Sequence, residues 1–149
     1  IKKIGNQVLR KLEKSGCKII GDNKIRKAYD KKIKKASIKD WSKEYLAPIV
    51  SVKSVKNLSE AIQHINKYGT MHTDCIITQN QKSAKKFLKE IKSSIAMHNT
   101  STQFADGGEF GFGGEVGIST NTLPPRGPVG LNQLVSYKYQ IKSKGVIRK

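Results

Sequence analysis

Alternating apolar and amphipathic stretches in the middle of the sequence constrain the fold more than any other feature. Short, largely β-branched runs at 49–55, 74–78 and 94–99 predict three strands. Between them lie two stretches with apolar residues at helical spacing, and Asn57 and Asn80 stand where N-caps are expected. Strand, helix, strand, helix and strand joined by short loops predict an α/β fold, with a parallel βαβαβ sheet and right-handed crossovers.

The segments on either side are less regular. Before the alternating part, the sequence predicts a helix over 2–14, a short strand at 18–21 and a weakly patterned, lysine-rich stretch over 22–43. After it, residues 100–133 hold most of the glycines and all but one of the prolines, which predicts irregular loops. From Leu134 the sequence alternates as a strand and predicts a terminal β-hairpin, whose apolar face needs cover from another subunit.

The chain carries a formal net charge of +18, from 29 Lys and Arg against 11 Asp and Glu. Such a charge is typical of proteins that bind nucleic acid or an anionic surface. The basic residues are nearly all lysines spread over every predicted helix, whereas base-reading proteins rely on the bidentate arginine side chain. Together with many Ile and Asn residues, this pattern favours compositional drift in an AT-rich coding sequence, so no nucleic-acid partner is expected.

The sequence also bears on location. It contains no apolar run of about 20 residues, so no membrane span is expected. It shows no charged segment followed by an apolar core at its start, so no secretion signal is expected either. The two cysteines form no CxxC pair, which fits a reducing compartment, and a cytoplasmic protein is predicted. The first residue is Ile1, inside a predicted helix, from which we expect a fragment or a recoded initiation site.

A glycine-rich run over 106–120 is the most conspicuous motif. A dinucleotide-binding fingerprint starting at Gly111 and Gly113 would require a third glycine where Val116 stands. The GK[ST] sequence of a phosphate-binding loop does not follow the run either. Composition therefore predicts only tight loops with close backbone approaches.

Neither cysteine has the surroundings of a nucleophile. Cys75 lies on a predicted strand and Cys17 at a helix–strand junction, whereas a reactive thiol needs an electropositive, partly exposed position. Both are expected to pack as small apolar residues. His72 and Asp74 lie near Cys75, but strand alternation directs Asp74 and Cys75 to opposite faces, so no metal site is expected.

Three blocks of the sequence match one family. They are residues 61–76 (AIQHINKYGTMHTDCI), residues 99–120 (NTSTQFADGGEFGFGGEVGIST) and residues 126–131 (RGPVGL), the last followed by SYK at 136–138. In this order they closely resemble the signature of the gamma-glutamyl phosphate reductases, also called glutamate-5-semialdehyde dehydrogenases, of the aldehyde dehydrogenase superfamily. The resemblance covers essentially the whole chain and is weakest over 22–43.

The resemblance implies an aldehyde dehydrogenase-like fold and a reaction. Members of the family reduce gamma-glutamyl phosphate with NADPH to glutamate semialdehyde and phosphate, in proline biosynthesis. A cysteine thiolate attacks the acyl phosphate, phosphate leaves, and hydride resolves the thioester. In the family that cysteine lies in a Pro-Gly-x-Cys loop, which this sequence lacks, and Cys75 falls at a position that the family does not use for chemistry.

Carried over residue by residue, the resemblance implies no catalytic residue in this chain and one cofactor contact. Glu44 resembles the superfamily glutamate that hydrogen-bonds the nicotinamide ribose. Five residues of one loop would line the substrate side of the cleft, namely Asn99, Ser101, Thr102, Gln103 and Phe104. Gln103 stands where family members usually have Arg, and Gln cannot supply the charged, bidentate pairing that Arg offers to phosphate or carboxylate.

The resemblance divides the chain into the C-terminal half of the catalytic domain (1–104), a glycine- and proline-rich loop segment (105–133) and an oligomerisation-type hairpin (134–149). We therefore predict a truncated reductase-like protein that is inactive alone and binds no NADP by itself. Its partners would be copies of itself, or a complementary N-terminal half with which it forms a split, active reductase. A third hypothesis, suggested by charge alone, is a basic nucleic-acid-binding module.

Overall fold

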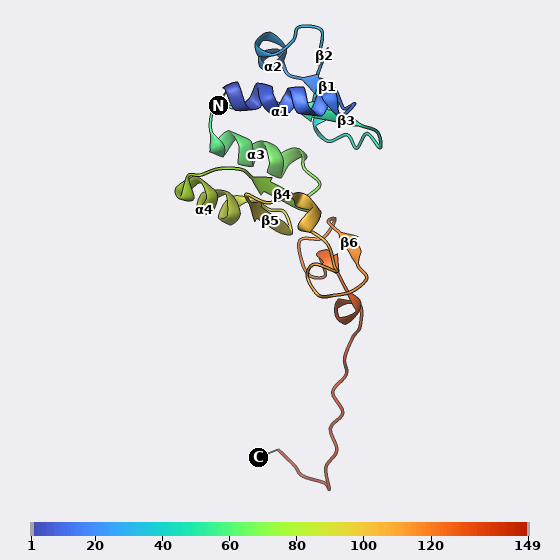
Figure 1. The fold of residues 1–149 in the computed structure, drawn as a ribbon. Coiled ribbons are helices and arrows are strands. Elements are labelled where there is room, and N and C mark those ends of the chain that lie inside the picture. The colour runs from blue at the N-terminus through green and yellow to red at the C-terminus, as the bar shows by residue number, and fades with distance from the viewer. Residues whose placement is uncertain (1, 149) are drawn as a thin grey trace.

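The structure, a computed structural model, describes residues 2–148, which form two α/β units, a loop-rich segment and an extended tail (Figure 1). The first unit contains two helices, three short strands and a 3-10 helix, η1. In chain order these are α1 (Lys2–Lys14), β1 (Lys18–Gly21), α2 (Asn23–Ala28), β2 (Lys34–Lys35), η1 (Ile38–Trp41) and β3 (Ile49–Val52). The strands run parallel in the spatial order β2-β1-β3.

A small apolar core holds the first unit together. Leu9 of α1, Ile19 of β1 and Ile33 are buried against one another. Gly16 ends α1 in the left-handed region at φ +79°, where glycine has no side chain to clash. This turn lets the chain reverse within three residues and lay β1 beneath the helix.

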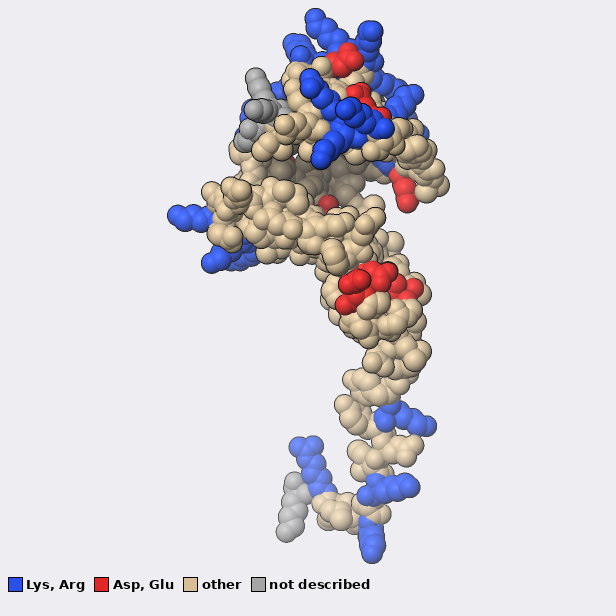
Figure 2. Space-filling view, in the orientation of Figure 1, with Lys and Arg blue, Asp and Glu red and all other residues tan. Residues whose placement is uncertain are grey.

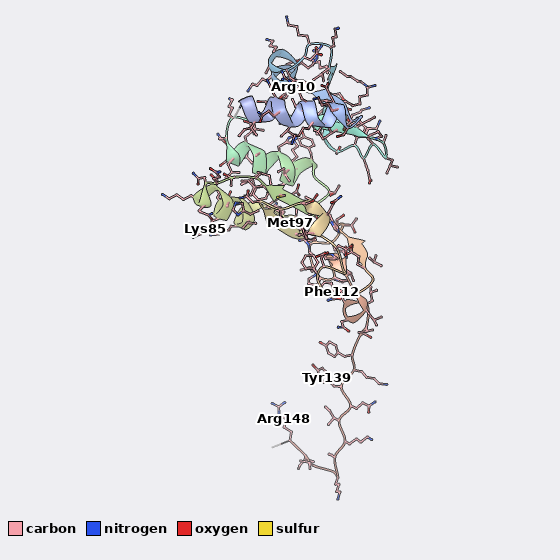
Figure 3. All side chains as sticks on the ribbon, in the orientation of Figure 1. Arg10, Lys85, Met97, Phe112, Tyr139 and Arg148 are labelled. Carbon is pink, nitrogen blue, oxygen red and sulfur yellow. The ribbon has the colours of Figure 1, made fainter. Side chains whose placement is uncertain are left out.

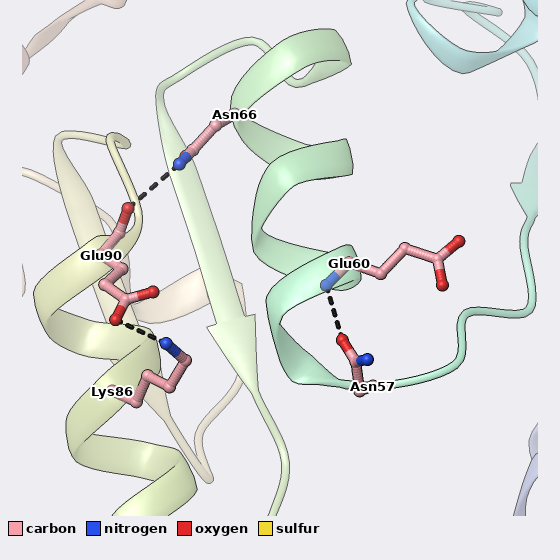
Figure 4. Close-up of polar contacts among 5 residues, drawn as sticks. All are labelled: Asn57, Glu60, Asn66, Lys86 and Glu90. Carbon is pink, nitrogen blue, oxygen red and sulfur yellow. Dashed lines mark hydrogen bonds and ion pairs between the residues drawn. The ribbon is translucent and has the colours of Figure 1, made fainter.

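The second unit is a strand–helix layer made of α3 (Leu58–Tyr68), β4 (Thr73–Ile76), α4 (Gln81–Glu90) and β5 (Ile95–His98). Both helices begin at the predicted N-caps. Asn57 accepts a hydrogen bond from the backbone N–H of Glu60 (2.9 Å, Figure 4), and Asn80 accepts one from that of Ser83 (2.9 Å). Each cap satisfies a backbone donor that would otherwise have no helical partner.

The two helices of this unit cover the parallel pair β4-β5. Ile62, Phe87 and Ile91 form its buried core. Asn66 of α3 donates to the Glu90 carbonyl (3.0 Å) and accepts from the Lys92 N–H (2.9 Å), which ties α3 to the end of α4. Figure 4 shows this contact beside the exposed ion pair of Lys86 with Glu90.

The predicted α/β class and the parallel pairing are confirmed, but the predicted strands do not share one sheet. β3 pairs with β1, Lys18 lying opposite Ile49, whereas β4 pairs with β5, Thr73 lying opposite Ile95. The physical reason is that the N-terminal segment brings its own strand, β1, and its own core, and β3 joins that sheet as an edge strand. Periodicity alone could not reveal that choice of partner.

A loop-rich segment follows β5 and ends in an extended tail. It contains η2 (Thr102–Phe104), an antiparallel pair of β6 (Val116–Ile118) with β7 (Gly127–Val129), and η3 (Leu131–Gln133). The structure describes no strand between 134 and 148, so the predicted terminal hairpin is wrong for this isolated chain. An alternating strand needs a partner edge, and here the tail runs away from both units with Tyr139 85% exposed (Figure 3). Across residues 2–148, the helices are all too short or too polar to span a membrane.

Candidate functional site

The predicted substrate-side loop begins at the carboxyl ends of the parallel strands β4 and β5. Ligands of parallel α/β sheets are commonly bound at this end. Asn99 takes up the left-handed conformation there, with φ +54°. Its Oδ1 accepts from the Thr78 N–H and its Nδ2 donates to the Thr78 carbonyl, both at 2.8 Å. Asn99 therefore fixes where the loop leaves the sheet.

The rest of the loop is a single turn of 3-10 helix. Ser101 caps η2 by accepting a hydrogen bond from the Gln103 N–H (3.2 Å). Ser101, Thr102, Gln103 and Phe104 are all exposed, and Phe104 is 54% exposed. The loop thus presents hydroxyls, an amide and an aromatic ring at one edge of the sheet, without a charged group. Gln103 offers neutral donors and acceptors where a cation would bind an anionic substrate more strongly.

Glu44, the predicted cofactor contact, lies in the loop between η1 and β3. It is exposed, and its neighbour Tyr45 anchors the loop: the Tyr45 hydroxyl donates to Asp40 Oδ1 (2.7 Å) and lies 2.8 Å from Ser51 Oγ. Ser51 of β3 in turn donates to the Asp40 carbonyl (3.0 Å). Through this network the strand holds the loop that carries Glu44.

Asp40 is a functional candidate that the sequence analysis missed. Its carboxylate accepts hydrogen bonds from the Ser37 hydroxyl (2.6 Å), the Ser37 N–H (2.7 Å) and Tyr45. These hydrogen bonds, those from Ser37 first, lower the pKa of Asp40 to about 2. The capping pattern of a serine followed three residues later by a carboxylate was the available signal.

The two predicted parts of the site lie on different units. The Glu44 loop belongs to the first unit and Asn99 to Phe104 belong to the second (Figure 1). Within the part of the chain that the structure describes, no hydrogen bond joins them. Each part is therefore placed by its own sheet.

Cys75 lies on β4, half-buried, directly beneath the start of the substrate-side loop. Its thiol donates to the Thr100 carbonyl at 3.2 Å and lies 3.6 Å from the carbonyl of Ile76. The contact gives Cys75 a role in holding the loop. Among residues 2–148 no group of three or more His, Cys, Asp or Glu side chains could hold a metal ion.

Asp74, the neighbour of Cys75, is partly buried and turned toward β5. Burial raises the pKa of its carboxyl, and a short hydrogen bond from the Ser93 hydroxyl partly opposes that shift. Asp74 accepts a hydrogen bond from Ser93, whereas Cys75 donates one to Thr100, so the two side chains have separate partners.

The glycine-rich segment packs on itself as tight turns. A Cβ added to Gly107 would lie 2.6 Å from the Cβ of Glu115 and 3.0 Å from the carbonyl oxygen of Gly113. The carboxylate of Asp106 accepts the N–H groups of Gly108 (2.8 Å) and Glu109 (3.3 Å). The prediction of close backbone approaches is confirmed. A carboxylate occupies the N–H groups that a phosphate would need.

Arg126 is a second residue whose role was not foreseen. Its Nε donates to Ser94 Oγ (2.8 Å), and its guanidinium also donates to the Lys92 carbonyl (2.7 Å). The planar side chain thus clamps the segment before β7 to the start of β5. Sequence alone gave no contact partner for it, because Lys92 and Ser94 lie more than 30 residues away.

Charge is unevenly distributed over the surface. Figure 2 shows Lys and Arg over the first unit and along the tail, and a patch of Asp and Glu on the glycine-rich segment. That patch comprises Asp106, Glu109 and Glu115, all exposed.

Comparison with known proteins gives a consistent picture. Residues 34–138 match the aldehyde dehydrogenase family. Over 141 residues, 95% of this chain, the sequence is 50% identical to the gamma-glutamyl phosphate reductase of Methylocella silvestris and 48% identical to that of Rhodospirillum rubrum. The chain spans about a third (33%) of the length of each of these curated relatives.

Solved structures agree with the sequence comparison. The crystal structure of the gamma-glutamyl phosphate reductase from Thermotoga maritima matches 99% of this chain with a TM-score of 0.88 and 42% identity. That match covers 36% of the Thermotoga chain. The reductase from Saccharomyces cerevisiae matches 78% of this chain, with a TM-score of 0.55 and 28% identity.

Proposed function

We propose that this chain, which belongs to the aldehyde dehydrogenase family, supplies the C-terminal, substrate-side part of a gamma-glutamyl phosphate reductase. The observation that carries the proposal is the agreement of 50% identity over 95% of the chain with a TM-score of 0.88 to a reductase structure. The reaction is the NADPH-dependent reduction of gamma-glutamyl phosphate to glutamate semialdehyde and phosphate. As part of a biosynthetic enzyme, the chain is proposed to act in the cytoplasm.

The substrate-side loop is proposed to bind the polar substrate through neutral groups. Asn99 fixes the start of the loop, and the hydroxyls of Ser101 and Thr102 are exposed at the carboxyl ends of the strands. Gln103 supplies an amide in place of a positive charge. We therefore expect weaker binding of the anionic substrate than a loop with Arg at this position would give.

Only part of the cofactor is proposed to contact this chain. NADPH supplies the hydride when it is bound. The exposed carboxylate of Glu44 fits the role of acceptor for a ribose hydroxyl, since its loop is anchored through Tyr45. In the glycine-rich segment, the carboxylate of Asp106 already accepts the N–H groups of Gly108 and Glu109, so these two are not proposed to bind the cofactor phosphates. The remaining contacts must come from residues outside this sequence.

The nucleophile is also proposed to come from residues outside this sequence. The Cys75 side chain donates a hydrogen bond to the Thr100 carbonyl, a contact that suits a structural role in holding the loop. The reductase thiol would reach this chain either through a longer polypeptide or from a separate one that completes a split enzyme. In both cases the 149-residue chain alone is expected to show no reductase activity.

A chimera tests this proposal. The region of the Methylocella silvestris reductase matched by this chain is replaced by residues 1–149, and NADPH-dependent turnover is measured. We expect activity with a raised KM for the acyl phosphate, and a KM lowered about tenfold by Gln103→Arg, since a charge-assisted pair contributes about 1.5–3 kcal/mol. Gln79→Arg, at an exposed position after β4, serves as the matched control. A folded chimera without turnover, with or without Gln103→Arg, would overturn the proposal.

The extended tail is proposed to pair with another copy in the assembled enzyme. Its alternating side chains, Val135, Tyr137, Tyr139 and Ile141, are 65–92% exposed. A strand of this kind is stable only on a partner edge. The chimera is expected to be oligomeric by analytical ultracentrifugation, and Tyr139→Glu is expected to dissociate it. Lys142→Glu, on the same tail, is the control for added negative charge.

A second candidate function rests on the basic first unit seen in Figure 2. Binding to duplex DNA would weaken steeply with salt if this surface were a nucleic-acid interface. The reductase proposal expects only weak binding that does not depend on sequence. A filter-binding titration at physiological salt separates the two functions, because non-specific binding has a Kd of about 10⁻⁴–10⁻⁶ M and a nucleic-acid interface is expected to bind more tightly.

A further inference from the structure

An apolar groove opens on the first unit between α1, α2 and the end of β3. Its volume is about 770 Å³. Six apolar residues form its floor and walls: Val8, Leu9, Ile25, Ala28, Val52 and Val55. Three lysines also line it: Lys24, Lys27 and Lys53. We call this feature the α1–α2 groove.

The α1–α2 groove is the uncovered end of a core. Leu9 at its base is buried with Ile19 and Ile33, whereas Val8, one residue earlier on α1, is 51% exposed. Ile4 lies one helical turn before Val8 and is 67% exposed. A contiguous apolar surface of this kind on a folded unit marks a contact with other protein.

The rim of the groove identifies the kind of partner. A second copy of this chain would bring its own +18 charge and its own exposed Lys24 and Lys27 into the contact, which like-charge repulsion opposes. The tail of another copy is a poor occupant for the same reason, because it carries Lys138, Lys142 and Lys144. A segment with apolar side chains flanked by Asp or Glu would match both the floor and the rim.

We propose that the α1–α2 groove is the docking surface for a segment of the other two thirds of the reductase, apolar on one side and acidic at its edges. This inference rests on the proposed function, because the relatives are about three times as long as this chain, which covers 33% of them. The two thirds of each relative that this chain does not match could cover the groove. Docking would bury Val8 and Ile4 and place carboxylates beside Lys24 and Lys27.

Thiol labelling of the groove tests the docking surface without relying on activity. Val8→Cys is made in a chain that also carries Cys17→Ser and Cys75→Ala, and alkylation by iodoacetamide at the new thiol is followed by peptide mass spectrometry. The rate is compared between the 149-residue chain and the Methylocella silvestris chimera. We expect labelling to be more than about tenfold slower in the chimera. The docked segment must first leave the groove before the reagent can reach the thiol.

A matched control tests whether slower labelling is confined to the groove. Leu88→Cys, at a position 41% exposed on α4 and away from both the groove and the substrate-side loop, is expected to react equally fast in both proteins. If the V8C thiol reacts as fast in the chimera as in the isolated chain, the docking surface is overturned. Turnover is read separately, in the chimera without the cysteine substitutions. An active chimera without protection refutes the groove alone, whereas a protected but inactive chimera refutes the proposed function alone.

Charge reversal on the rim provides a second, independent measurement. Lys24→Glu with Lys27→Glu is expected to raise the labelling rate of the V8C thiol in the chimera at least about fivefold, because repulsion from the partner's carboxylates favours the open state. The same reversal at Lys85 and Lys89 on α4 preserves the total charge change and is expected to leave the rate unchanged. Equal effects of the two double variants would contradict the acidic character of the partner segment.

Discussion

The side chain of Asn99 forms two hydrogen bonds with the main chain of Thr78, accepting its N–H and donating to its carbonyl, each at 2.8 Å. These bonds join the residues just beyond the carboxyl ends of β4 and β5. Asn99 also holds φ +54°, which most residues with a Cβ avoid. One residue therefore sets both the spacing of the strand ends and the direction of the substrate-side loop.

Replacement of Asn99 separates these two contributions. Asn99→Gly removes the hydrogen bonds but keeps the left-handed backbone accessible, and we expect a loss of about 1–2 kcal/mol in the free energy of unfolding. Asn99→Ala adds backbone strain and should cost about 1 kcal/mol more. Urea denaturation measures both variants. An alanine variant as stable as the glycine variant would contradict a role for the backbone conformation.

The Asp40 network predicts a dependence of stability on pH. The folded-state pKa of Asp40, about 2, lies below its ordinary value of 3.8. The carboxylate therefore adds stability that is fully present above about pH 4 and is lost as the pH falls toward 2. In the Asp40→Asn variant, the melting temperature should depend less on pH in this window. Ser37→Ala, which removes one hydroxyl donor, should move the loss to higher pH. An unchanged profile in both variants would rule the network out.

Asp74 predicts a dependence of opposite sign. Burial raises its pKa in the folded protein, so stability falls as the pH rises from about 4 through the folded-state pKa. Asp74→Asn removes the buried charge and is expected to raise the melting temperature at pH 7 but not at pH 3. Ser93→Ala, which deletes the opposing hydrogen bond, should lower it at pH 7. A lower melting temperature for Asp74→Asn at pH 7 would show that the charge is stabilising.

Arg126 is expected to hold the β6–β7 pair in place. Arg126→Ala removes its donors to Ser94 and Lys92 and should speed amide hydrogen exchange over residues 127–129. Arg126→Lys should not restore protection, because a single ammonium cannot span both acceptors. Arg10→Ala on the exposed face of α1 is the control. Full protection in Arg126→Lys would mean that charge alone suffices.

The glycine-rich segment offers a matched pair of glycines. A Cβ at Gly107 would lie 2.6 Å from that of Glu115, whereas a Cβ at Gly114 would meet nothing within 4 Å. Gly107→Ala should destabilise the protein by about 1–3 kcal/mol through overpacking. Gly114→Ala should change stability little. Thermal melts compare them, and equal melting temperatures would refute the tight packing at Gly107.

Much of the local structure could be predicted from local sequence. Asn57 and Asn80 begin their helices as expected, because an N-cap acts on backbone N–H groups only three residues away. The strand predicted at 49–55 ends at Val52, since β1 contributes only four residues to pair with it. Strand ends depend on a partner, and a partner lies far along the chain.

For the candidate site too, the sequence indicated some residues and the structure added others. The resemblance indicated Glu44 and the loop from Asn99, and these residues lie at strand-adjacent loops of two units. Asp40 and Arg126 escaped notice because their importance rests on contacts: Asp40 gathers Ser37 and Tyr45, and Arg126 reaches Ser94.

The sequence by itself determined the family, the α/β class and the helix starts, since these depend on residue identity, on periodicity and on caps a few residues away. Only the tertiary structure decided that β3 pairs with β1, that the Cys75 thiol donates a hydrogen bond to the Thr100 carbonyl, and that the tail from Leu134 has no partner edge. The physical reason is that pairing, burial and hydrogen-bond direction are set between segments distant in sequence. The open α1–α2 groove belongs to this second class, because its walls come from three separate elements.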